Sequence, residues 1–377
     1  MFKSLLLENF KCFKTMEKEI AFSNVNLLTG SNGRGKSSLF QSVLLLSQSY
    51  ELGRDFRSIR LSGKFLDLGS YKDIVYKGNK EEKIEISLTT DNDEGDNVKF
   101  VCKSGKNDGI ETLIDDIYVD GVSLVNEVSK DAMGDNSGNF DKESEKTFVP
   151  TSTYEIFSQF ANVFFVSAER EGPRNAVRML EENVSDQIGI HGEKVINSLY
   201  ERKEDFQDVV AKELSQILDG ASVHVSSSDL EYVRILLDSL DGSAGFKPVN
   251  VGFGYSYVLP LVVLPLIVPA NSKLFIENPE AHLHPGAQSR MMDFLLRCSK
   301  QKNIQLFIET HSDHIVNAMR IAVKENRIDR TFGKIVHIAR NNNEPVIWQI
   351  ELDKYGNLSD YPDEFLDEWG NQMAQLV

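Results

Sequence analysis

The chain has 377 residues, of which 41% are hydrophobic and 26% charged, a composition that fits a globular protein and excludes a disordered one. Its 57 acidic and 41 basic residues give a net charge of −16. This charge argues against attraction of nucleic acid to the whole surface, although a local basic strip remains possible. The three cysteines lie far apart and show neither a disulfide framework nor zinc-ligand spacing, so we expect a cytoplasmic protein.

The N-terminal part predicts short strands that lead into a glycine-rich loop. Apolar stretches at 3–8, 18–22 and 25–29 have the length of strands, and the last is followed directly by Gly30. Residues 37–49 have helical length and contain neither Gly nor Pro. A strand, a glycine-rich loop and a helix in this order are the context in which a phosphate loop forms.

The loop from Gly30 to Ser37 reads GSNGRGKS and fits the pattern G-x-x-x-x-G-K-[ST]. Glycines let backbone N–H groups turn inward, and these amides favour an anion together with the N-terminus of the following helix. Lys36 is expected to neutralise the β- and γ-phosphates of ATP, and Ser37 to hold Mg²⁺. The predicted cofactors are therefore ATP and Mg²⁺, and the predicted nucleotide-binding residues are Gly30, Ser31, Asn32, Gly33, Arg34, Gly35, Lys36, Ser37 and Ser38.

The middle of the chain predicts elements but no chemistry. Residues 66–125 alternate in period two in places and indicate a β-rich insertion. Residues 127–147 are polar and predict a mobile surface loop, whereas 174–220 carry apolar residues at helical spacing. The apolar run at 257–270 is too short to span a bilayer, which needs about 20 residues, so it predicts buried core.

Two later strands end in polar groups that suit a nucleotide site. The strand predicted at 273–277 ends in Glu277, and the strand predicted at 304–309 is followed by His311. Short apolar strands of this kind are typical of a parallel sheet. In P-loop ATPases a carboxylate at the end of such a strand holds Mg²⁺ from its second side, and a histidine at the end of another can reach a γ-phosphate.

Taken together, these motifs resemble a known family. The sequences VGFGYSYVLP at 251–260, PEAHLHP at 279–285 and THSDH at 310–314 are similar to those of ABC-type ATPases of the SMC/RecF/OLD-like branch, the bacterial "AAA family ATPases". The resemblance covers roughly residues 1–75 and 160–370.

The resemblance implies an α/β fold, namely a P-loop ABC-ATPase head with an N-terminal β-rich lobe, a central parallel sheet and an inserted helical lobe. We expect one head over 1–377. Its segments would be 1–165 with the phosphate loop and the β-rich insertion, 166–250 as the helical lobe, and 251–377 with the signature, the Walker B strand and the His switch.

The resemblance also implies roles for individual residues. Gly252, Gly254 and Ser256 stand where the signature motif presents its serine and amides to ATP held by a second subunit. Glu277 occupies the position of the Mg²⁺-side carboxylate, and His311 that of the switch histidine. Such heads work as head-to-tail homodimers that clamp two ATP molecules, and higher oligomers built from them are also compatible with the sequence.

Two departures from the family pattern bear on catalysis. The usual catalytic glutamate is replaced by Asn278, which cannot act as a general base but can orient a water. Glu280 is then a candidate base, or hydrolysis is slow. In addition, no Gln follows the first helix between residues 49 and 158, and the segment 67–72 is an unassigned substitute.

Some polar residues have two readings. His282 and His284 form an H-x-H pair that predicts a structural or subunit-contact role rather than a metal site, since no Cys lies near. Arg170 and Arg174 follow a strand predicted to be buried, and they serve either the nucleotide or subunit interface or a structural salt bridge.

The sequence leaves three functions open. Because the chain lacks long coiled-coil arms and a TOPRIM domain after His311, we expect an ATP hydrolase without its own effector. The family occurs beside separate effectors in bacterial anti-phage and mobile-element loci, and by this analogy we expect the same context. The alternatives are a nucleotide-gated switch with negligible hydrolysis, and a RecF-like protein that binds DNA through Arg54, Arg57 and Arg60, which are a solvated face in the simpler reading.

Overall fold

The computed structural model describes most of the chain. The described residues are 1–50, 58–78, 83–91, 96–105, 112–124, 154–180, 187–202, 204–220, 222–227, 231–238, 245–250, 254–341, 344–362, 364–365 and 368–376. The surface loop predicted at 127–147 lies outside them, as do Arg54 and Arg57 of the basic stripe and Gly252 of the signature.

Two compact units make up the described chain, and each joins segments that are far apart in sequence. Unit 1 comprises Met1–Phe22, Gly30–Val163 and Ile338–Gln349, and unit 2 comprises Ser23–Thr29, Phe164–His337 and Ile350–Val377. The chain therefore passes from unit 2 to unit 1 at the first residue of the phosphate loop. The predicted segments 1–165, 166–250 and 251–377 do not follow these units, and that division stays a prediction.

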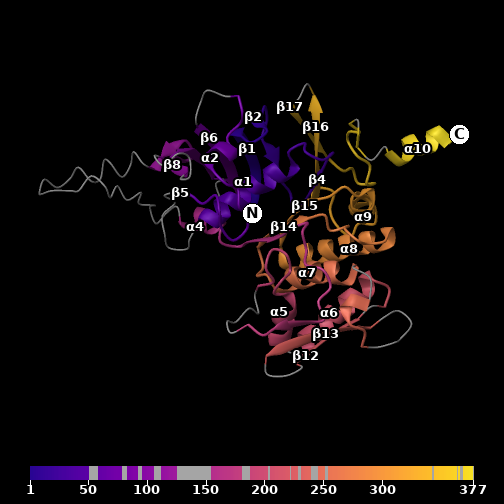
Figure 1. The fold of residues 1–377 in the computed structure, drawn as a ribbon. Coiled ribbons are helices and arrows are strands. Elements are labelled where there is room, and N and C mark those ends of the chain that lie inside the picture. The colour runs from indigo at the N-terminus through magenta and orange to yellow at the C-terminus, as the bar shows by residue number, and fades with distance from the viewer. Residues whose placement is uncertain are drawn as a thin grey trace, which may run out of the picture. The chain divides into compact units, whose positions relative to one another are not determined.

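An antiparallel sheet forms the framework of unit 1 (Figure 1). The strand order is β2-β1-β6-β7-β8-β5, with β3 paired to β1 and β9 to β8. Buried and half-buried residues alternate along β6, as expected of a strand with one face on the core. The predicted β-rich insertion is confirmed. The strands are β1 (Phe2–Phe10), β2 (Phe13–Thr15), β3 (Ile20–Ala21), β5 (Ser58–Ile59), β6 (Lys83–Thr90), β7 (Asn97–Ser104), β8 (Thr112–Val119) and β9 (Val122–Ser123).

Helix α1 (Lys36–Ser49) of unit 1 follows the phosphate loop, as predicted, and the short helices α2 (Tyr71–Ile74) and α4 (Tyr154–Ser158) come later in the same unit. Gln48, near the end of α1, fixes the next segment of chain. Its side-chain nitrogen donates to the carbonyl of Arg60 at 2.5 Å, and its oxygen accepts from the amide of Leu66 at 3.0 Å. Gln48 therefore holds the segment 60–66 from within helix α1. The family pattern places its glutamine later, on the strand that follows this helix.

Parallel strands dominate the second large sheet, whose order is β10-β14-β15-β4-β16-β17. β14, β15, β4 and β16 run parallel, and Glu277 stands beside Glu309 in the register. β4 and β15 are buried along their whole length, as in sheets covered on both faces. The predicted central parallel sheet is confirmed. Its strands are β4 (Val25–Thr29), β10 (Val163–Val166), β14 (Lys273–Glu277), β15 (Gln305–Glu309), β16 (Gly333–Asn341) and β17 (Glu344–Ile350).

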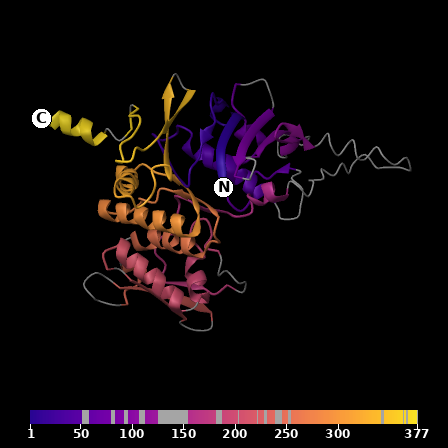
Figure 2. The same cartoon turned by 180° about the vertical axis from the view of Figure 1, so that it is seen from behind.

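Three helices of unit 2 stack side by side, with α8 (Pro285–Lys302) between α7 (Gly254–Ile267) and α9 (Asp313–Lys324), as both views show (Figures 1 and 2). Residues 258–265 of α7 are all buried although Pro260 and Pro265 lie inside the helix. A helix that is apolar all round belongs in a core. The predicted core run at 257–270 is thus confirmed for 258–265, most of it is helix, and its last two residues are exposed.

The remaining lobe of unit 2 is mixed rather than helical, which corrects the expectation for 174–220. Residues 176–178 form a strand because their side chains alternate at the edge of a three-stranded antiparallel sheet, β11-β13-β12, where Val177 faces the buried Val233. Helices α5 and α6 cover the apolar face of this sheet. The elements are β11 (Ala176–Arg178), α5 (Val195–Glu201), α6 (Glu204–Ile217), β12 (Ser222–Ser227), β13 (Tyr232–Asp238) and the 3₁₀ helix η3 (Pro248–Asn250).

The last element of the described chain is α10 (Glu368–Leu376). Met373 and Leu376 on it are exposed. Across the residues that the structure describes, no helix combines the length and the apolar character needed to cross a membrane.

Candidate nucleotide site

Glycine is required at two positions of the phosphate loop. Gly30 has φ +131°, and a Cβ there would lie 2.3 Å from the carbonyl oxygen of Ile338. Gly35 has φ +114°, and its Cβ would lie 2.8 Å from the Sγ of Cys12. Residues with a side chain rarely adopt these backbone angles, and Cβ atoms in proteins do not approach other atoms so closely. The loop therefore has the backbone that lets amides face an anion.

Lys36 is the cation of this loop. It opens helix α1 and is 3% exposed. Its Nζ donates to the carbonyl oxygens of Gly30 at 2.8 Å and Ser31 at 3.1 Å, so the ammonium group lies against the loop backbone. Ser37 and Ser38 follow in the first turn of α1, where backbone N–H groups favour negative charge.

The turn between β1 and β2 also reaches the start of α1, which the sequence analysis missed. The Lys11 Nζ donates to the side-chain oxygen of Gln41, and the Cys12 Sγ lies 3.9 Å from the Oγ of Ser38. Burial lowers the pKa of Lys11 and raises that of Cys12. In the sequence, the only signal was that Lys11 and Cys12 lie between two apolar stretches. Their contacts with helix α1 depend on how the sheet folds.

Glu277 lies at the carboxyl end of β14, in unit 2. Its Oε2 accepts from the backbone amide of Ala168 at 2.9 Å and lies 3.5 Å from the hydroxyl oxygen of Ser167. Both partners directly follow β10, the strand beside β14 in the sheet. The neighbouring strand thus orients this carboxylate, whose second oxygen has the chemistry of a Mg²⁺ ligand.

Asn278 adopts a left-handed backbone conformation, with φ +44°. Its amide donates to the carbonyl of Glu309 at 2.8 Å, and its own carbonyl accepts from the amide of Ala281 at 3.1 Å, closing a tight turn. Among residues other than glycine, Asn and Asp enter this region most readily, whereas Glu pays about 1–2 kcal/mol. The backbone therefore gives a physical reason for Asn where the family pattern has Glu.

Glu280 anchors the segment that carries His311. One carboxylate oxygen accepts from the Thr310 hydroxyl at 2.8 Å, and the other from the backbone amide of His311 at 2.8 Å. The next residue, Ser312, caps helix α9 by accepting from the amide of His314 at 3.1 Å. The sequence proposed Glu280 as a displaced base, and the geometry gives it a second role, fixing the turn that carries His311.

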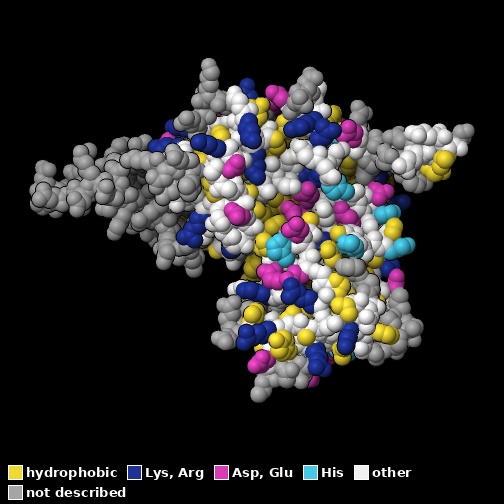
Figure 3. Space-filling model, viewed as in Figure 1, with side chains coloured by type: hydrophobic (Ala, Val, Ile, Leu, Met, Phe, Trp, Pro, Cys, Tyr) yellow, Lys and Arg dark blue, Asp and Glu magenta, His cyan; other side chains and the backbone are white. Residues whose placement is uncertain are grey.

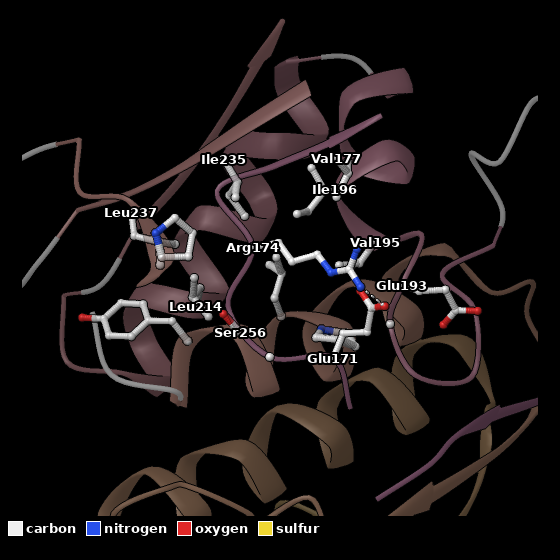
Figure 4. A pocket seen from close by; sticks show the side chains of 16 residues that line it. Glu171, Arg174, Val177, Glu193, Val195, Ile196, Leu214, Ile235, Leu237 and Ser256 are labelled. Atoms are coloured by element: carbon white, nitrogen blue, oxygen red, sulfur yellow. Dashed lines mark hydrogen bonds and ion pairs between the residues drawn. The ribbon is translucent and has the colours of Figure 1, made fainter. Parts of the chain in front are cut away.

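The signature position lies at the beginning of helix α7. Gly254 is its first residue, and a Cβ there would lie 3.0 Å from the carbonyl of His282. Ser256 follows in the first turn and lines a small pocket together with apolar side chains such as Ile235 and with the charged Glu171 and Arg174 (Figure 4). The pocket holds about 30 Å³, enough for one or two water molecules and far too little for a nucleotide.

The H-x-H pair has structural contacts. The ring of His282 packs 4.3 Å from that of Tyr257, and His284 caps α8 by accepting from the amide of Gly286. Within the described chain, no cluster of three or more His, Cys, Asp or Glu side chains could hold a metal ion.

Comparison with known families decides the assignment. A family model described as "AAA domain" matches residues 4–232, which is more than half of the chain. The chain belongs to the AAA-domain family. A model described as "AAA ATPase domain" matches residues 174–316, and one described as "Protein of unknown function (DUF3696)" matches residues 337–376.

Proteins similar to this AAA-domain protein indicate which type of ATPase fold it has. The DNA replication and repair protein RecF of Clostridioides difficile (strain 630) is 34% identical over 91 residues, which are 24% of each protein, so the match spans about a quarter of that relative's length. The SMC head domain from Thermotoga maritima aligns with a TM-score of 0.50 at 15% identity, covering 93% of this chain and 99% of that one. An SMC head bound to the C-terminal winged-helix domain of ScpA aligns with a TM-score of 0.56 at 16% identity, covering 94% and 98%. The chain is an SMC/RecF-like ABC-type ATPase in fold.

Replacing Thr310 with valine separates the two roles of Glu280. The change removes the hydroxyl that donates to Glu280 and that also accepts from the backbone amide of Ser312 at 3.1 Å, and it leaves the carboxylate in place. If Glu280 acts as an anchor, Thr310→Val and Glu280→Gln each lower single-turnover ATP hydrolysis roughly tenfold. If Glu280 is the general base, the hydrolysis rate of Glu280→Gln falls by a factor of about 10²–10⁴, and the rate of Thr310→Val stays close to that of wild type. Thr331→Val, in an exposed loop of the same unit, is the matched control.

Proposed function

We propose that this AAA-domain protein is an ATP-binding head that dimerises around two ATP molecules, hydrolyses them slowly and controls a separate effector. The backbone of the phosphate loop carries the proposal. Gly30 and Gly35 have φ angles that residues with a side chain rarely adopt, and a Cβ at Gly30 would meet the backbone carbonyl oxygen of Ile338 at 2.3 Å, so the loop needs glycine where its amides must stay open to an anion.

Residues of each unit have the donor chemistry that Mg²⁺ and ATP require. The loop amides and the Lys36 ammonium group suit phosphates, and the Ser37 hydroxyl and the Glu277 carboxylate are hard oxygen ligands of the kind that Mg²⁺ takes. When bound, Mg²⁺-ATP supplies the phosphoryl group to be transferred and neutralises part of its charge. Asn32 and Arg34 of the same loop, with Ser31, Gly33 and Ser38, complete the proposed nucleotide contacts.

Slow hydrolysis follows from Asn278. An amide orients a water but accepts no proton at neutral pH, so the step lacks the usual base. Both carboxylate oxygens of Glu280 already accept hydrogen bonds, one from the Thr310 hydroxyl and one from the His311 amide, so this group is engaged in holding that turn. His311, placed by Glu280, is proposed as the γ-phosphate contact.

Dimerisation is proposed from the signature. Gly254 and Ser256 lie at the N-terminus of a fourteen-residue helix, whose free N–H groups favour the phosphate of a second subunit. Gly252 belongs to the same motif but lies outside the described residues. The SMC head in one matching structure is bound to a domain of another protein, ScpA. By that likeness, and by the family's genomic context, we propose that this head controls an effector in bacterial anti-phage defence.

The test measures subunit mass and ATP turnover together. Wild type is expected to be monomeric without nucleotide, dimeric or larger with Mg²⁺-ATP, and slow in turnover. Ser256→Arg is expected to bind ATP normally yet stay monomeric, because arginine replaces the signature hydroxyl and is too large for the pocket that Ser256 lines. An unchanged Tm without nucleotide checks that this variant folds. Ser226→Arg, on the exposed strand β12, is the control. ATP-dependent assembly that persists in Ser256→Arg would contradict the proposed dimer.

Two alternatives have their own support. Dimerisation on ATP with no measurable turnover would make the protein a nucleotide-gated switch, which Asn278 favours. The RecF likeness favours DNA binding, for which salt-sensitive association is the signature. On the face shown in Figure 3, however, Lys and Arg side chains are scattered among acidic and apolar ones instead of forming one continuous strip.

A further inference from the structure

Arg170 is a buried cation with an unusual set of partners. Its side chain is among the buried charged groups of the protein, and the residue is only 5% exposed. Its Nη1 donates to the carbonyl oxygen of Glu277 at 3.3 Å, and its Nη2 to the carbonyl oxygen of Asn278 at 2.5 Å. One guanidinium group therefore holds two consecutive carbonyls at the end of β14, on both sides of the left-handed turn.

The same guanidinium group meets the signature helix. It lies over the ring of Tyr257 at 5.7 Å from the centroid, and Tyr257 is the residue after Ser256 on α7. The Tyr257 ring in turn packs against His282 at 4.3 Å. Arg170 thus touches both the helix proposed to receive the second subunit's ATP and the turn proposed to orient the attacking water.

The contacts continue to the switch histidine. The turn held by Arg170 runs directly into Glu280, whose carboxylate fixes Thr310 and His311. Burying a guanidinium group is unfavourable unless its surroundings compensate for the lost hydration. Here the carboxylates of Glu277 and Glu280 interact favourably with its charge, and burial still lowers the pKa of Arg170 to about 10. At neutral pH the cation stays charged.

We propose that Arg170 is a positioning residue that couples the signature helix to the Asn278 turn, so that closure of the dimer sets the geometry for hydrolysis. This inference rests on the proposed function and adds the path within one subunit. A movement of Tyr257 reaches Asn278 through a rigid, planar group that contacts both. Arg174, in the same segment, has no such place, because its side chain is exposed and pairs with Glu171 at 2.7 Å.

The experiment compares three measurements on the full chain, namely affinity for a fluorescent ATP analogue, ATP-dependent dimerisation, and steady-state hydrolysis with its kcat and KM. Arg170→Met and Arg170→Lys are expected to lower kcat at least tenfold, with KM and dimerisation within twofold of wild type. Arg170→Lys is expected not to restore kcat, because a single ammonium group does not reproduce the planar guanidinium group that donates to two carbonyls. Arg178→Met, which changes an exposed arginine on strand β11, is the control and should behave as wild type.

Variants of Tyr257 test the same coupling while the buried Arg170 stays in place. Tyr257→Leu should lower kcat as well, and Tyr257→Phe, which keeps the ring, should not. The double variant Arg170→Met/Tyr257→Leu should be no slower than Arg170→Met, since both changes break one path. If the Arg170 variants fail to fold, a normal kcat in Tyr257→Leu overturns the proposal by itself.

Three other outcomes distinguish failure of the Arg170 inference from failure of the proposed ATP-dependent function. Equal losses in dimerisation and turnover would make Arg170 merely structural and overturn the inference. Wild type that dimerises on ATP without hydrolysing it also overturns the inference but leaves nucleotide-gated assembly intact. Wild type that binds no ATP overturns the proposed function itself.

Discussion

Replacing Lys36 with alanine is expected to weaken ATP binding at least 100-fold and to abolish ATP-dependent assembly. Lys36 is the buried cation of the phosphate loop, and its ammonium group lies against the carbonyls of Gly30 and Ser31, where the backbone already directs it. A hydrogen bond to a charged group contributes about 1.5–3 kcal/mol, so losing contacts with two phosphates costs a factor of about 10²–10⁴.

The measurement is titration with a fluorescent ATP analogue, beside thermal unfolding of the nucleotide-free protein. Lys14→Ala, an exposed lysine on β2, removes the same charge from the same unit and should keep wild-type affinity. If Lys36→Ala bound ATP as tightly as wild type, the phosphate loop would not be the nucleotide site. If both lysine variants lost affinity equally, the effect would be one of net charge alone.

Much of the fold could be predicted from the sequence because its main signals are local. The apolar run at 25–29, the glycines after it and the uninterrupted helix together specify a strand, a loop and α1. The strands that end in Glu277 and Glu309 each carry three consecutive apolar residues, as expected of strands in a sheet that is covered on both faces. The lobe around β11 was predicted incorrectly because three residues at a sheet edge carry too little periodicity to compete with the helical spacing around them.

Predicting the candidate site was harder, since its decisive contacts join residues far apart in sequence. The sequence marked Asn278 as a departure, but only the backbone shows that it occupies a left-handed turn that disfavours Glu. Glu280 was proposed for chemistry, and its contacts with Thr310 and His311 depend on β14 and β15 lying side by side. For Arg170 both readings were open, and its partners turned out to be backbone carbonyls, which no side-chain motif records.

Gly30→Ala and Gly33→Ala should differ sharply although both change one atom of the same loop. At position 30 the new Cβ would lie 2.3 Å from the Ile338 carbonyl oxygen, at a backbone angle that alanine rarely adopts. Backbone strain of about 1–3 kcal/mol and overpacking of about 1–3 kcal/mol both apply there. At position 33 the Cβ meets no atom within 4 Å, and only a left-handed φ of +72° opposes it, at about 1–2 kcal/mol.

Thermal unfolding without nucleotide should therefore show the larger loss of Tm for Gly30→Ala, together with loss of ATP binding. Gly33→Ala should lose less stability and, because its backbone position stays accessible, keep measurable affinity. The comparison isolates the loop's shape from its charge, since Lys36 is untouched in both variants. Equal losses at the two positions would mean that the loop relaxes around an added methyl group, and the contact with Ile338 would then not hold the phosphate-binding backbone in place.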